Sequence, residues 1–416
     1  GGDDILIGGD GNDVIDGGSG TNRLYADAGD DTITSSGTND VVDAGEGDNT
    51  IYISGNGGTY TSGSGDDNYF IQDDASGDIR INVGEGDNSF VIEDDFRGQL
   101  FINDWNSPLV EGSQIIEMSG GEVRDLYLGN GDDVLNINEG TMSSGYSSTI
   151  YTRGGSDVVN IDGQVSYFNL RLGDGDDTTN FSGDLGTGWG NWGGEIYGEN
   201  GDDTITFLGQ GGNRGYIYGQ EGNDTIDLSE RSNKDGDDYY WLASYGGDGN
   251  DNLIGNDYGD HLYGDNGNDT INAGDGNNTA GGGNGDDYLE SGSGRDNLFG
   301  GNGDDIFKAG GENDIIYGGN RTSGKGDDGS IDTAVFSGAS TDYKLSRATD
   351  TNFEYVYYIQ DKREGSPDGL DTLYDIDFLR FDNEDLSINS FYEINVGDGS
   401  EGETITRTEG DDLIDG

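Results

Sequence analysis

The sequence contains no cysteine, two prolines and a single histidine, His261. The lack of cysteine excludes disulfide bonds and thiolate metal sites as sources of stability. One histidine excludes a zinc site of the HExxH type within this chain, and no G-x-S-x-G motif is present. The longest apolar runs are far shorter than the roughly 18 residues that a membrane-spanning helix needs. These absences leave no recognisable catalytic constellation.

Basic residues are also scarce, because 19 Lys and Arg stand against 85 Asp and Glu, giving a formal net charge of -66. Such a charge makes nucleic acid and anionic membranes poor partners, and no membrane insertion is expected. The glycine-rich turns carry aspartate instead of lysine, which excludes a phosphate-binding loop. With only 30% hydrophobic residues, the chain would stay unfolded unless bound cations offset its charge.

Glycine is abundant, with 81 residues, and it recurs in a nine-residue pattern. From Gly8 to Phe70 the chain reads as seven consecutive nonapeptides, beginning GGDGNDVID, GGSGTNRLY and ADAGDDTIT. The same register returns from Gly246 with GGDGNDNLI. Position 8 is apolar, so the last three residues predict a short strand with one side chain inside and two outside.

The first six positions of the pattern suit a calcium ion. Glycines at positions 1, 2 and 4 permit positive φ and a close approach of backbone carbonyl groups. Aspartate at position 6 adds a carboxylate, and calcium prefers such oxygen ligands. On the order of ten to twenty Ca²⁺ ions are therefore expected along the chain.

The nonapeptides closely resemble the RTX (repeats-in-toxin) calcium-binding repeat, G-G-x-G-x-D-x-U-x. The resemblance implies an all-β fold, a right-handed parallel β-roll with 18 residues per turn and calcium between stacked turns. It also implies type I secretion from a bacterium as an unfolded chain. The near-identical phrases IYGENGDDTIT at Ile196 and IYGQEGNDTID at Ile217 would then be one turn plus three inserted residues apart.

Alternate nonapeptides should lie on opposite edges of the roll. On one edge, here called the aspartate edge, position 6 is Asp13, Asp31, Asn49, Asp67, Asn88, Asp133, Asp157, Asp177, Asp203, Asp224, Asp251, Asp269, Asp287 and Asp305. On the other, the mixed edge, it is Asp4, Asn22, Asp40, Gly58, Ile79, Arg124, Ser148, Ser166, Gly194, Gly215, Asp260, Asn278, Asp296 and Asp314. Sequence drift would affect both edges alike, so the contrast favours a nearly continuous calcium column on the aspartate edge. On the mixed edge, calcium is expected near Asp40 and from Asp260 onward.

The expected metal ligands are these aspartates together with glycines of the same turns. The glycines are Gly9, Gly11, Gly247, Gly249, Gly267, Gly283, Gly285, Gly301 and Gly303. Asp412 is added, because the register resumes near the C-terminal end of the sequence. No catalytic residue is predicted.

The register divides the chain into seven segments: repeats at 1–91, 119–227 and 246–330, interruptions at 92–118 and 228–245, a capping segment at 331–396, and the start of another block at 397–416. Both prolines, Pro108 and Pro367, lie outside the repeats, as expected for residues that cannot donate to a β-ladder. Alternating apolar residues in the capping segment predict antiparallel strands. That segment resembles the one that closes many RTX blocks, and the chain is expected to be a fragment of a larger protein.

Aromatic residues outside the core have two interpretations. Tyrosines at position 9 gather on one edge, at Tyr25, Tyr127, Tyr151, Tyr197, Tyr218, Tyr263 and Tyr317. They could form an adhesive face, although stacking between turns is favoured. Trp105, Trp189, Trp192 and Trp241 could bind sugars, although a role in filling irregular turns is favoured.

The sequence therefore predicts a calcium-dependent extracellular structural protein, such as a bacterial cell-surface adhesin, an S-layer protein or a matrix component. Possible partners are copies of itself or cell-surface glycans. Two alternatives remain open: a glycan-binding module, and the non-catalytic region of an RTX enzyme or toxin. Loss of glycan binding on Trp189→Ala would favour the first, and flanking sequence would identify the second.

Overall fold

The computed structural model describes residues 1–93, 96–103, 111–119, 122–138, 148–162, 168–182, 192–211, 214–233, 242–319, 330–349, 355–365, 367–388 and 403–405. The chain divides into two compact units, Gly1–Tyr245 and Gly246–Gly416. Strand β25 (Leu242–Asp248) includes residues of both. Each unit is described by itself.

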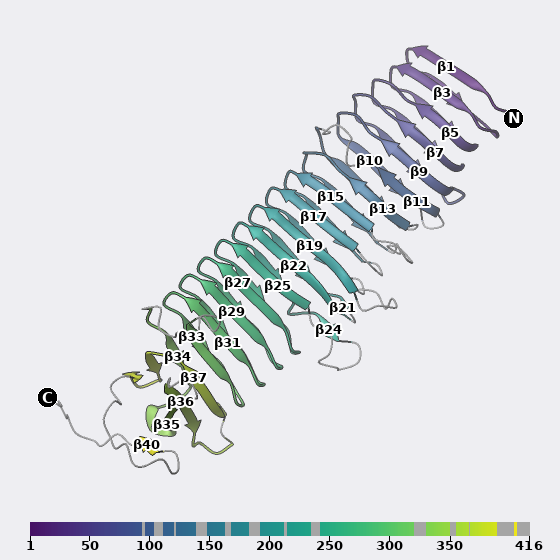
Figure 1. Cartoon of the computed structure of the whole chain (residues 1–416). Coiled ribbons are helices and arrows are strands. Elements are labelled where there is room, and N and C mark those ends of the chain that lie inside the picture. The colour runs from purple at the N-terminus through teal and green to yellow at the C-terminus, as the bar shows by residue number, and fades with distance from the viewer. Residues whose placement is uncertain are drawn as a thin grey trace. The chain divides into compact units, whose positions relative to one another are not determined.

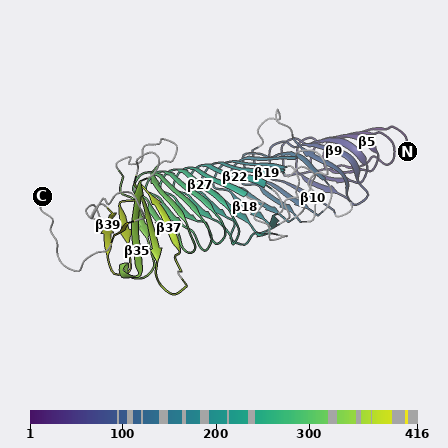
Figure 2. The ribbon, with the colours of Figure 1, turned by 60° about the horizontal axis from the view of Figure 1, so that its bottom comes forward.

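Unit 1 is a parallel β-solenoid built from two series of strands (Figures 1 and 2). The first series is β1 (Ile5–Asp10), β3 (Arg23–Ala28), β5 (Thr38–Asp43), β7 (Asn56–Thr61), β9 (Ser76–Asn82), β11 (Arg97–Ile102), β13 (Glu122–Tyr127), β15 (Ser148–Gly154), β17 (Phe168–Asp174), β19 (Trp192–Asn200) and β22 (Arg214–Glu221). The second is β2 (Val14–Asp16), β4 (Thr32–Ser35), β6 (Thr50–Ile53), β8 (Asn68–Ile71), β10 (Asn88–Ile92), β12 (Gln114–Met118), β14 (Val134–Ile137), β16 (Val158–Ile161), β18 (Thr178–Phe181), β20 (Thr204–Phe207) and β23 (Thr225–Asp227). A short parallel pair, β21 (Gln210–Gly211) and β24 (Ser232–Asn233), lies outside both series.

The strand register confirms that two nonapeptides make one turn. Leu6 pairs with Leu24 and Ile15 with Ile33, so these strands are joined to the strands 18 residues later. Ile196 pairs with Ile217, which shows that three inserted residues are accommodated without loss of register. The position-8 side chains form the core, and Leu24, Ile33 and Ile51 are fully buried.

The solenoid continues through part of the stretch predicted as an interruption at 92–118. Strand β11 pairs in parallel with β9, and β12 pairs with both β10 and β14. The buried Ile116 fills position 8 there, and Gln114 fills position 6. The sequence pattern hid this turn because "SQIIEM" carries glutamine where aspartate was expected.

Unit 2 repeats the architecture, with 18-residue spacing from β26 to β33 and longer insertions before β34, β37 and β38. One series is β27 (His261–Asn266), β29 (Thr279–Asn284), β31 (Asn297–Asn302), β33 (Ile315–Gly319) and β37 (Leu370–Tyr374). The other is β26 (Asn252–Ile254), β28 (Thr270–Asn272), β30 (Tyr288–Glu290), β32 (Ile306–Lys308), β34 (Thr333–Val335) and β38 (Phe378–Arg380). Leu262, Ala280, Leu298 and Ile316 pair in succession and are buried.

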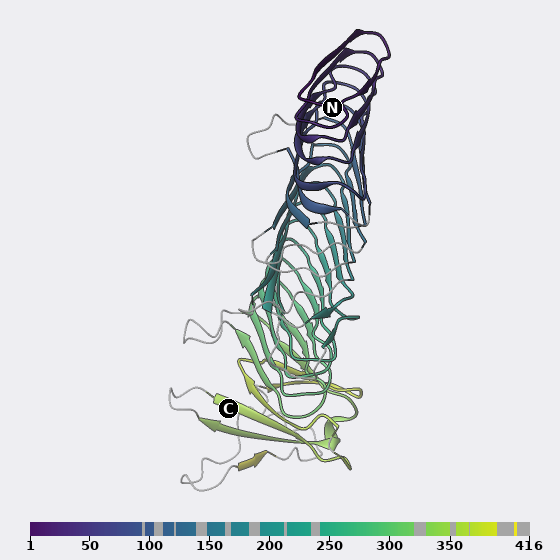
Figure 3. The same cartoon turned by 90° about the vertical axis from the view of Figure 1, so that its right-hand side faces the viewer.

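The predicted capping segment combines both strand directions (Figure 3). Strands β35 (Tyr343–Thr349), β36 (Tyr355–Asp361) and β37 form an antiparallel sheet, and β40 (Glu403–Ile405) adds to β35. Strand β39 (Asp385–Ser387) pairs antiparallel with β38. However, β34, β37 and β38 extend the parallel ladders. The antiparallel prediction is therefore confirmed for part of the segment, while the rest continues the solenoid.

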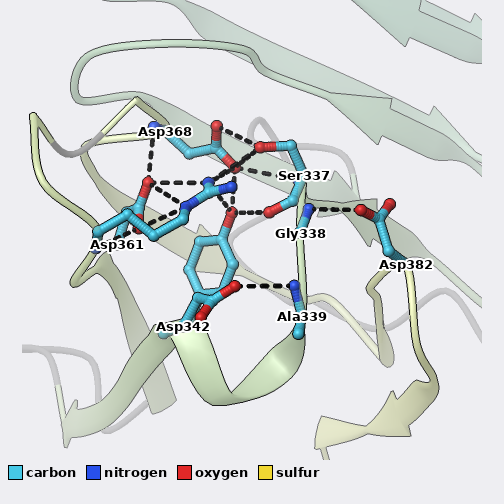
Figure 4. A network of polar contacts seen from close by, with 9 residues as sticks. Ser337, Gly338, Ala339, Asp342, Asp361, Asp368 and Asp382 are labelled. Atoms are coloured by element: carbon cyan, nitrogen blue, oxygen red, sulfur yellow. Dashed lines mark hydrogen bonds and ion pairs between the residues drawn. The ribbon is translucent and has the colours of Figure 1, made fainter.

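A polar network around Arg363 fixes the cap (Figure 4). The Arg363 guanidinium forms ion pairs with Asp361 at 2.8 Å and Asp368 at 3.1 Å. It also donates to the hydroxyl groups of Tyr343 and Ser337. Asp361 is 1% exposed, so the arginine supplies the charge that this buried carboxylate requires.

The one helix within the described ranges is the single turn η1 (Ser340–Asp342). Over those same residues, none of the helical structure is long and apolar enough to traverse a bilayer.

Candidate calcium sites

Position 4 of each turn brings backbone carbonyl oxygens into a row along the edge. Gly11, Gly29 and Gly47 have φ values of 111°, 138° and 110°, a region that favours glycine. A Cβ atom on Gly29 would overlap the carbonyl group of Gly11, and one on Gly47 would overlap that of Gly29. Glycine is therefore required both for its backbone conformation and for the close approach of successive turns.

The position-6 side chains on the aspartate edge form a ladder. The backbone N–H of Asp13 donates to Asp31 Oδ1 at 2.7 Å, that of Asp157 to Asp177 Oδ1 at 2.7 Å, and that of Asp177 to Asp203 Oδ1 at 2.8 Å. The same bond, from the backbone N–H of one position-6 residue to the side-chain oxygen of the next, joins Asp31, Asn49, Asp67 and Asn88 in turn. It also joins Gln114, Asp133 and Asp157, and Asp203 to Asp224. In unit 2 it links 251, 269, 287 and 305. One oxygen of each carboxylate is thus fixed by the fold.

In five of these carboxylates the second oxygen is buried and has no hydrogen-bond donor. This holds for Oδ2 of Asp31, Asp177, Asp203, Asp269 and Asp287, whose side chains are at most 2% exposed. A buried carboxylate oxygen without a hydrogen bond costs several kcal/mol unless a cation or proton neutralises it. The edge therefore presents a row of oxygens that need a positive partner.

Burial dominates the electrostatics of this row. Desolvation raises the pKa of Asp177 and Asp269 to about 7 and that of Asp203 to about 8, although the backbone hydrogen bonds oppose the rise. Neighbouring carboxylates in the same ladder raise the pKa further. A divalent cation would reverse this effect by favouring the ionised form.

The donor set fits calcium. Within the described residues no three carboxylate or imidazole side chains converge on one point, so each turn contributes one carboxylate together with backbone carbonyls. At Gly198 a Cβ would overlap Asp203 Oδ2 and would lie 2.6 Å from the Gly219 carbonyl oxygen. A carboxylate oxygen and a backbone carbonyl oxygen thus lie close to Gly198, and oxygens of this kind suit a hard cation that takes six to eight oxygen ligands.

The mixed edge has position-6 ladders only in part. In unit 1, Asp4 N–H donates to Asn22 Oδ1, and Asn22 N–H donates to Asp40 Oδ1. In unit 2 the ladder runs through Asp260, Asn278, Asp296 and Asp314. Between them the level of Asp40 continues through other residues: Asp40 pairs with Gly58, Gly58 with Ile79 and Ile79 with Leu100, which pairs with Val123 at a register shift, and further along Ser148 pairs with Phe168. The assignment of Ser166 was wrong, because Ser148 pairs with Phe168; Ser166 itself lies outside the described residues.

Three predicted ligands have protein donors on their second oxygen. Asp40 Oδ2 accepts the Ser35 hydroxyl at 2.7 Å and the Gly37 N–H at 3.1 Å. Asp260 Oδ2 accepts the Asn256 N–H at 2.8 Å. Asp133 Oδ2 accepts the Gly129 N–H at 3.3 Å. The donors to Asp40 and Asp260 reduce the need of these two carboxylates for a cation, whereas burial still raises the pKa of Asp133 to about 8.

Two carboxylates that sequence reasoning missed extend the ladders into the cap. Asp305 N–H donates to Asp332 Oδ1 at 3.0 Å, and Asp314 N–H donates to Asp371 Oδ1 at 2.9 Å. Burial raises the pKa of Asp371 to about 9. The signal was present in "DTA" and "DTL", which repeat the Asp-x-apolar spacing of positions 6 to 8. Asp412, by contrast, lies outside the described residues.

The position-9 aromatic residues stack between turns. Ring centroids are 5.0 Å apart for Tyr197 and Tyr218 and 5.1 Å apart for Tyr218 and Tyr245. In unit 2, Tyr317 stacks on Phe299 and on Tyr374. This geometry accounts for Tyr197, Tyr218 and Tyr317 through packing between turns. Trp105, Trp189, Trp241 and the side chain of Trp192 lie outside the described residues.

Comparison with known protein families gives one result. The model of the RTX calcium-binding nonapeptide repeat (four copies) matches residues 1–33, 16–51, 25–59, 216–230, 245–280 and 281–316. No curated protein matches the chain. The matched segments include the turns of Asp13, Asp31, Asp269 and Asp287, where the second carboxylate oxygen has no donor.

Proposed function

We propose that this chain, an RTX nonapeptide-repeat protein, is a calcium-dependent extracellular structural protein that folds as calcium binds along its edges. The observation that carries the proposal is the row of buried carboxylate oxygens without donors, set among backbone carbonyls. Calcium supplies the positive charge that those oxygens require. We propose on the order of ten to twenty ions, about one for each turn that offers such an oxygen.

Secretion through a type I system and a bacterial cell-surface role, as an adhesin, S-layer or matrix component, are part of this proposal. The net charge of -66 opposes compaction where calcium is scarce. Extracellular calcium modules bind at about 10⁻⁴–10⁻³ M, so the chain would fold after export. Outward stacked aromatic residues such as Tyr197 and Tyr218 offer a surface for copies of the chain or for surface glycans.

We do not propose catalysis. The regular turns use their aspartates in a repeated backbone ladder, which supports a structural role for them. His261, the one histidine in the sequence, lies in strand β27, and burial lowers its pKa.

Chelation of calcium tests the proposal. The full chain should show β-structure by circular dichroism and a compact form by sedimentation in about 1 mM calcium, and it should lose both in excess chelator. Magnesium serves as the control and should not restore the fold, because Mg²⁺ is smaller than Ca²⁺ and demands stricter octahedral geometry. A chain that keeps its β-signal and its sedimentation coefficient in chelator would contradict the proposal.

A further inference from the structure

Among the residues that the structure describes, position 6 carries an amide instead of a carboxylate at five places, and the amide nitrogen bonds to the backbone of the turn. The residues are Asn22, Asn49, Asn88, Gln114 and Asn278. Asn49 Nδ2 donates to the Gly47 carbonyl at 2.8 Å, and Asn88 Nδ2 donates to the Gly86 carbonyl at 3.1 Å. Gly47 and Gly86 occupy position 4, whose carbonyls form the row described above.

Asparagine and aspartate are held in the ladder in the same way. Asp31 N–H donates to Asn49 Oδ1 at 3.0 Å, just as Asp157 N–H donates to Asp177 Oδ1 at 2.7 Å. The second head-group atom therefore has the same place in both kinds of turn. In an asparagine turn this atom is a donor that bonds to a backbone carbonyl, whereas in the turns of Asp31, Asp177 and Asp203 it is Oδ2, which has no donor.

Gln114 shows that a longer side chain reaches carbonyls of two turns. Its Nε2 donates to the Gly112 carbonyl at 3.2 Å and to the Gly86 carbonyl of the preceding turn at 3.3 Å. On the mixed edge, Asn278 Nδ2 donates to the Gly274 carbonyl at 3.0 Å, and Asn22 Nδ2 donates to the Gly18 carbonyl at 3.2 Å. Gly274 and Gly18 occupy position 2 of their repeats, so on this edge the amide bonds to the position-2 carbonyl of its turn, and Asn278 Nδ2 also reaches the position-4 carbonyl of Gly276 at 3.4 Å.

We propose that these amides take the place of a calcium ion, so that their turns fold without calcium and do not bind it. In an aspartate turn, a calcium ion would neutralise Oδ2 and contact the carbonyl oxygens. In an amide turn the side chain carries no charge and its N–H bonds to a carbonyl oxygen, so neither group needs the ion. Asp40 reaches the same result by accepting the Ser35 hydroxyl and the Gly37 N–H on Oδ2. The column of calcium ions on the aspartate edge of unit 1 is then interrupted at Asn49 and again at Asn88 and Gln114.

This inference rests on the proposed calcium-dependent fold, and paired substitutions in the full chain test it. Asn49→Asp, Asn88→Asp and Gln114→Glu are combined in one variant. Asn82→Asp, Asn138→Asp and Asn272→Asp form the control, because these exposed residues receive the same added charge away from position 6. Bound calcium is counted by mass spectrometry of the metal after equilibrium dialysis. We expect about three more ions in the first variant and no change in the control.

The reverse exchange keeps the test decisive if the first variant does not fold. Asp177→Asn should lose about one ion and should retain more β-structure in chelator than either the unaltered chain or Asp177→Ala. An unchanged ion count in the first variant, or an Asp177→Asn that unfolds in chelator like Asp177→Ala, would overturn the inference. If the unaltered chain binds no calcium, the proposed function itself fails, which is a separate outcome.

Discussion

At the scale of the residue, position 6 joins two roles in one side chain. Its first oxygen accepts a backbone N–H from the preceding turn, as Asp31 does from Asp13. Its second atom, whether Oδ2 or an amide nitrogen, decides which partner the turn needs. Two nearly isosteric residues can therefore share one backbone geometry and differ in their demand for a cation.

On the aspartate edge position 4 is glycine for two reasons that single substitutions can separate. Gly201 has φ 135°, and a Cβ there would overlap the carbonyl group of Gly175. Gly11 has φ 111° but no atom within 4 Å of its Cβ position. We expect Gly201→Ala to lower the free energy of unfolding in calcium by about 3 kcal/mol and Gly11→Ala by about 1 kcal/mol. Urea titration measures both, and equal losses would show that the close approach of the turns contributes nothing.

Protonation should partly replace calcium in the turns where the position-6 Oδ2 has no hydrogen-bond donor. The pKa of Asp177 is raised to about 7 and that of Asp203 to about 8, whereas an unfolded aspartate titrates near about 3.9. The folded, calcium-free state therefore binds protons more tightly, so its stability is lost as the pH rises through about 7 to 8 and is regained as the pH falls toward about 4. We expect chelated protein to gain β-structure between about pH 8 and about pH 5.

Circular dichroism in chelator across that range tests this expectation. In saturating calcium the pH dependence should be the opposite, with β-structure lost as the pH falls, because protons compete with calcium for the carboxylates. A chelated chain whose β-signal falls as the pH is lowered would show that these buried carboxylates do not govern folding.

At the scale of the element, each strand depends on its neighbours one turn away. Phe181 and Phe207 stack in the core with centroids 4.7 Å apart, and Tyr69 stacks on Phe90 at 5.0 Å. These pairs lie in the part of unit 1 where position-6 carboxylates are missing from the mixed edge. Aromatic packing thus contributes to cohesion between turns whose mixed edge lacks position-6 carboxylates.

The cap uses an arginine where the turns use calcium, and this predicts a specific weakness. Arg363→Ala leaves the buried Asp361 carboxylate without its ion pair and should cost unit 2 about 3 kcal/mol in the free energy of unfolding. Arg380→Ala removes an exposed pair with Asp385 and should cost less than about 1 kcal/mol. Thermal unfolding in saturating calcium compares the two variants. Equal effects would indicate that the network around Arg363 does not stabilise the cap.

At the scale of the whole molecule, the nine-residue period was enough to predict a parallel solenoid and the residues that line its aspartate edge. The period could not predict turns that keep the solenoid geometry with residues outside the nonapeptide pattern. Gln114 holds position 6 by the same backbone bond as aspartate, and its turn was therefore missed. Asp332 and Asp371 belong to turns separated from the repeats by long insertions. Asp40 accepts the hydroxyl of Ser35, which stands at position 1 of the same nonapeptide, where the pattern has glycine and so predicts no side-chain donor.

The central claim is that calcium lies where a position-6 carboxylate oxygen has no donor and is absent where an amide supplies one. A crystal of the full chain grown in calcium, with an anomalous-difference map, tests this most directly. The account predicts peaks beside Asp31, Asp177, Asp203, Asp269 and Asp287, where Oδ2 has no protein donor. It predicts no peak beside Asn49, Asn88 or Gln114, whose amides bond to the turn carbonyls. Peaks of equal height beside the amide and the carboxylate turns would contradict it.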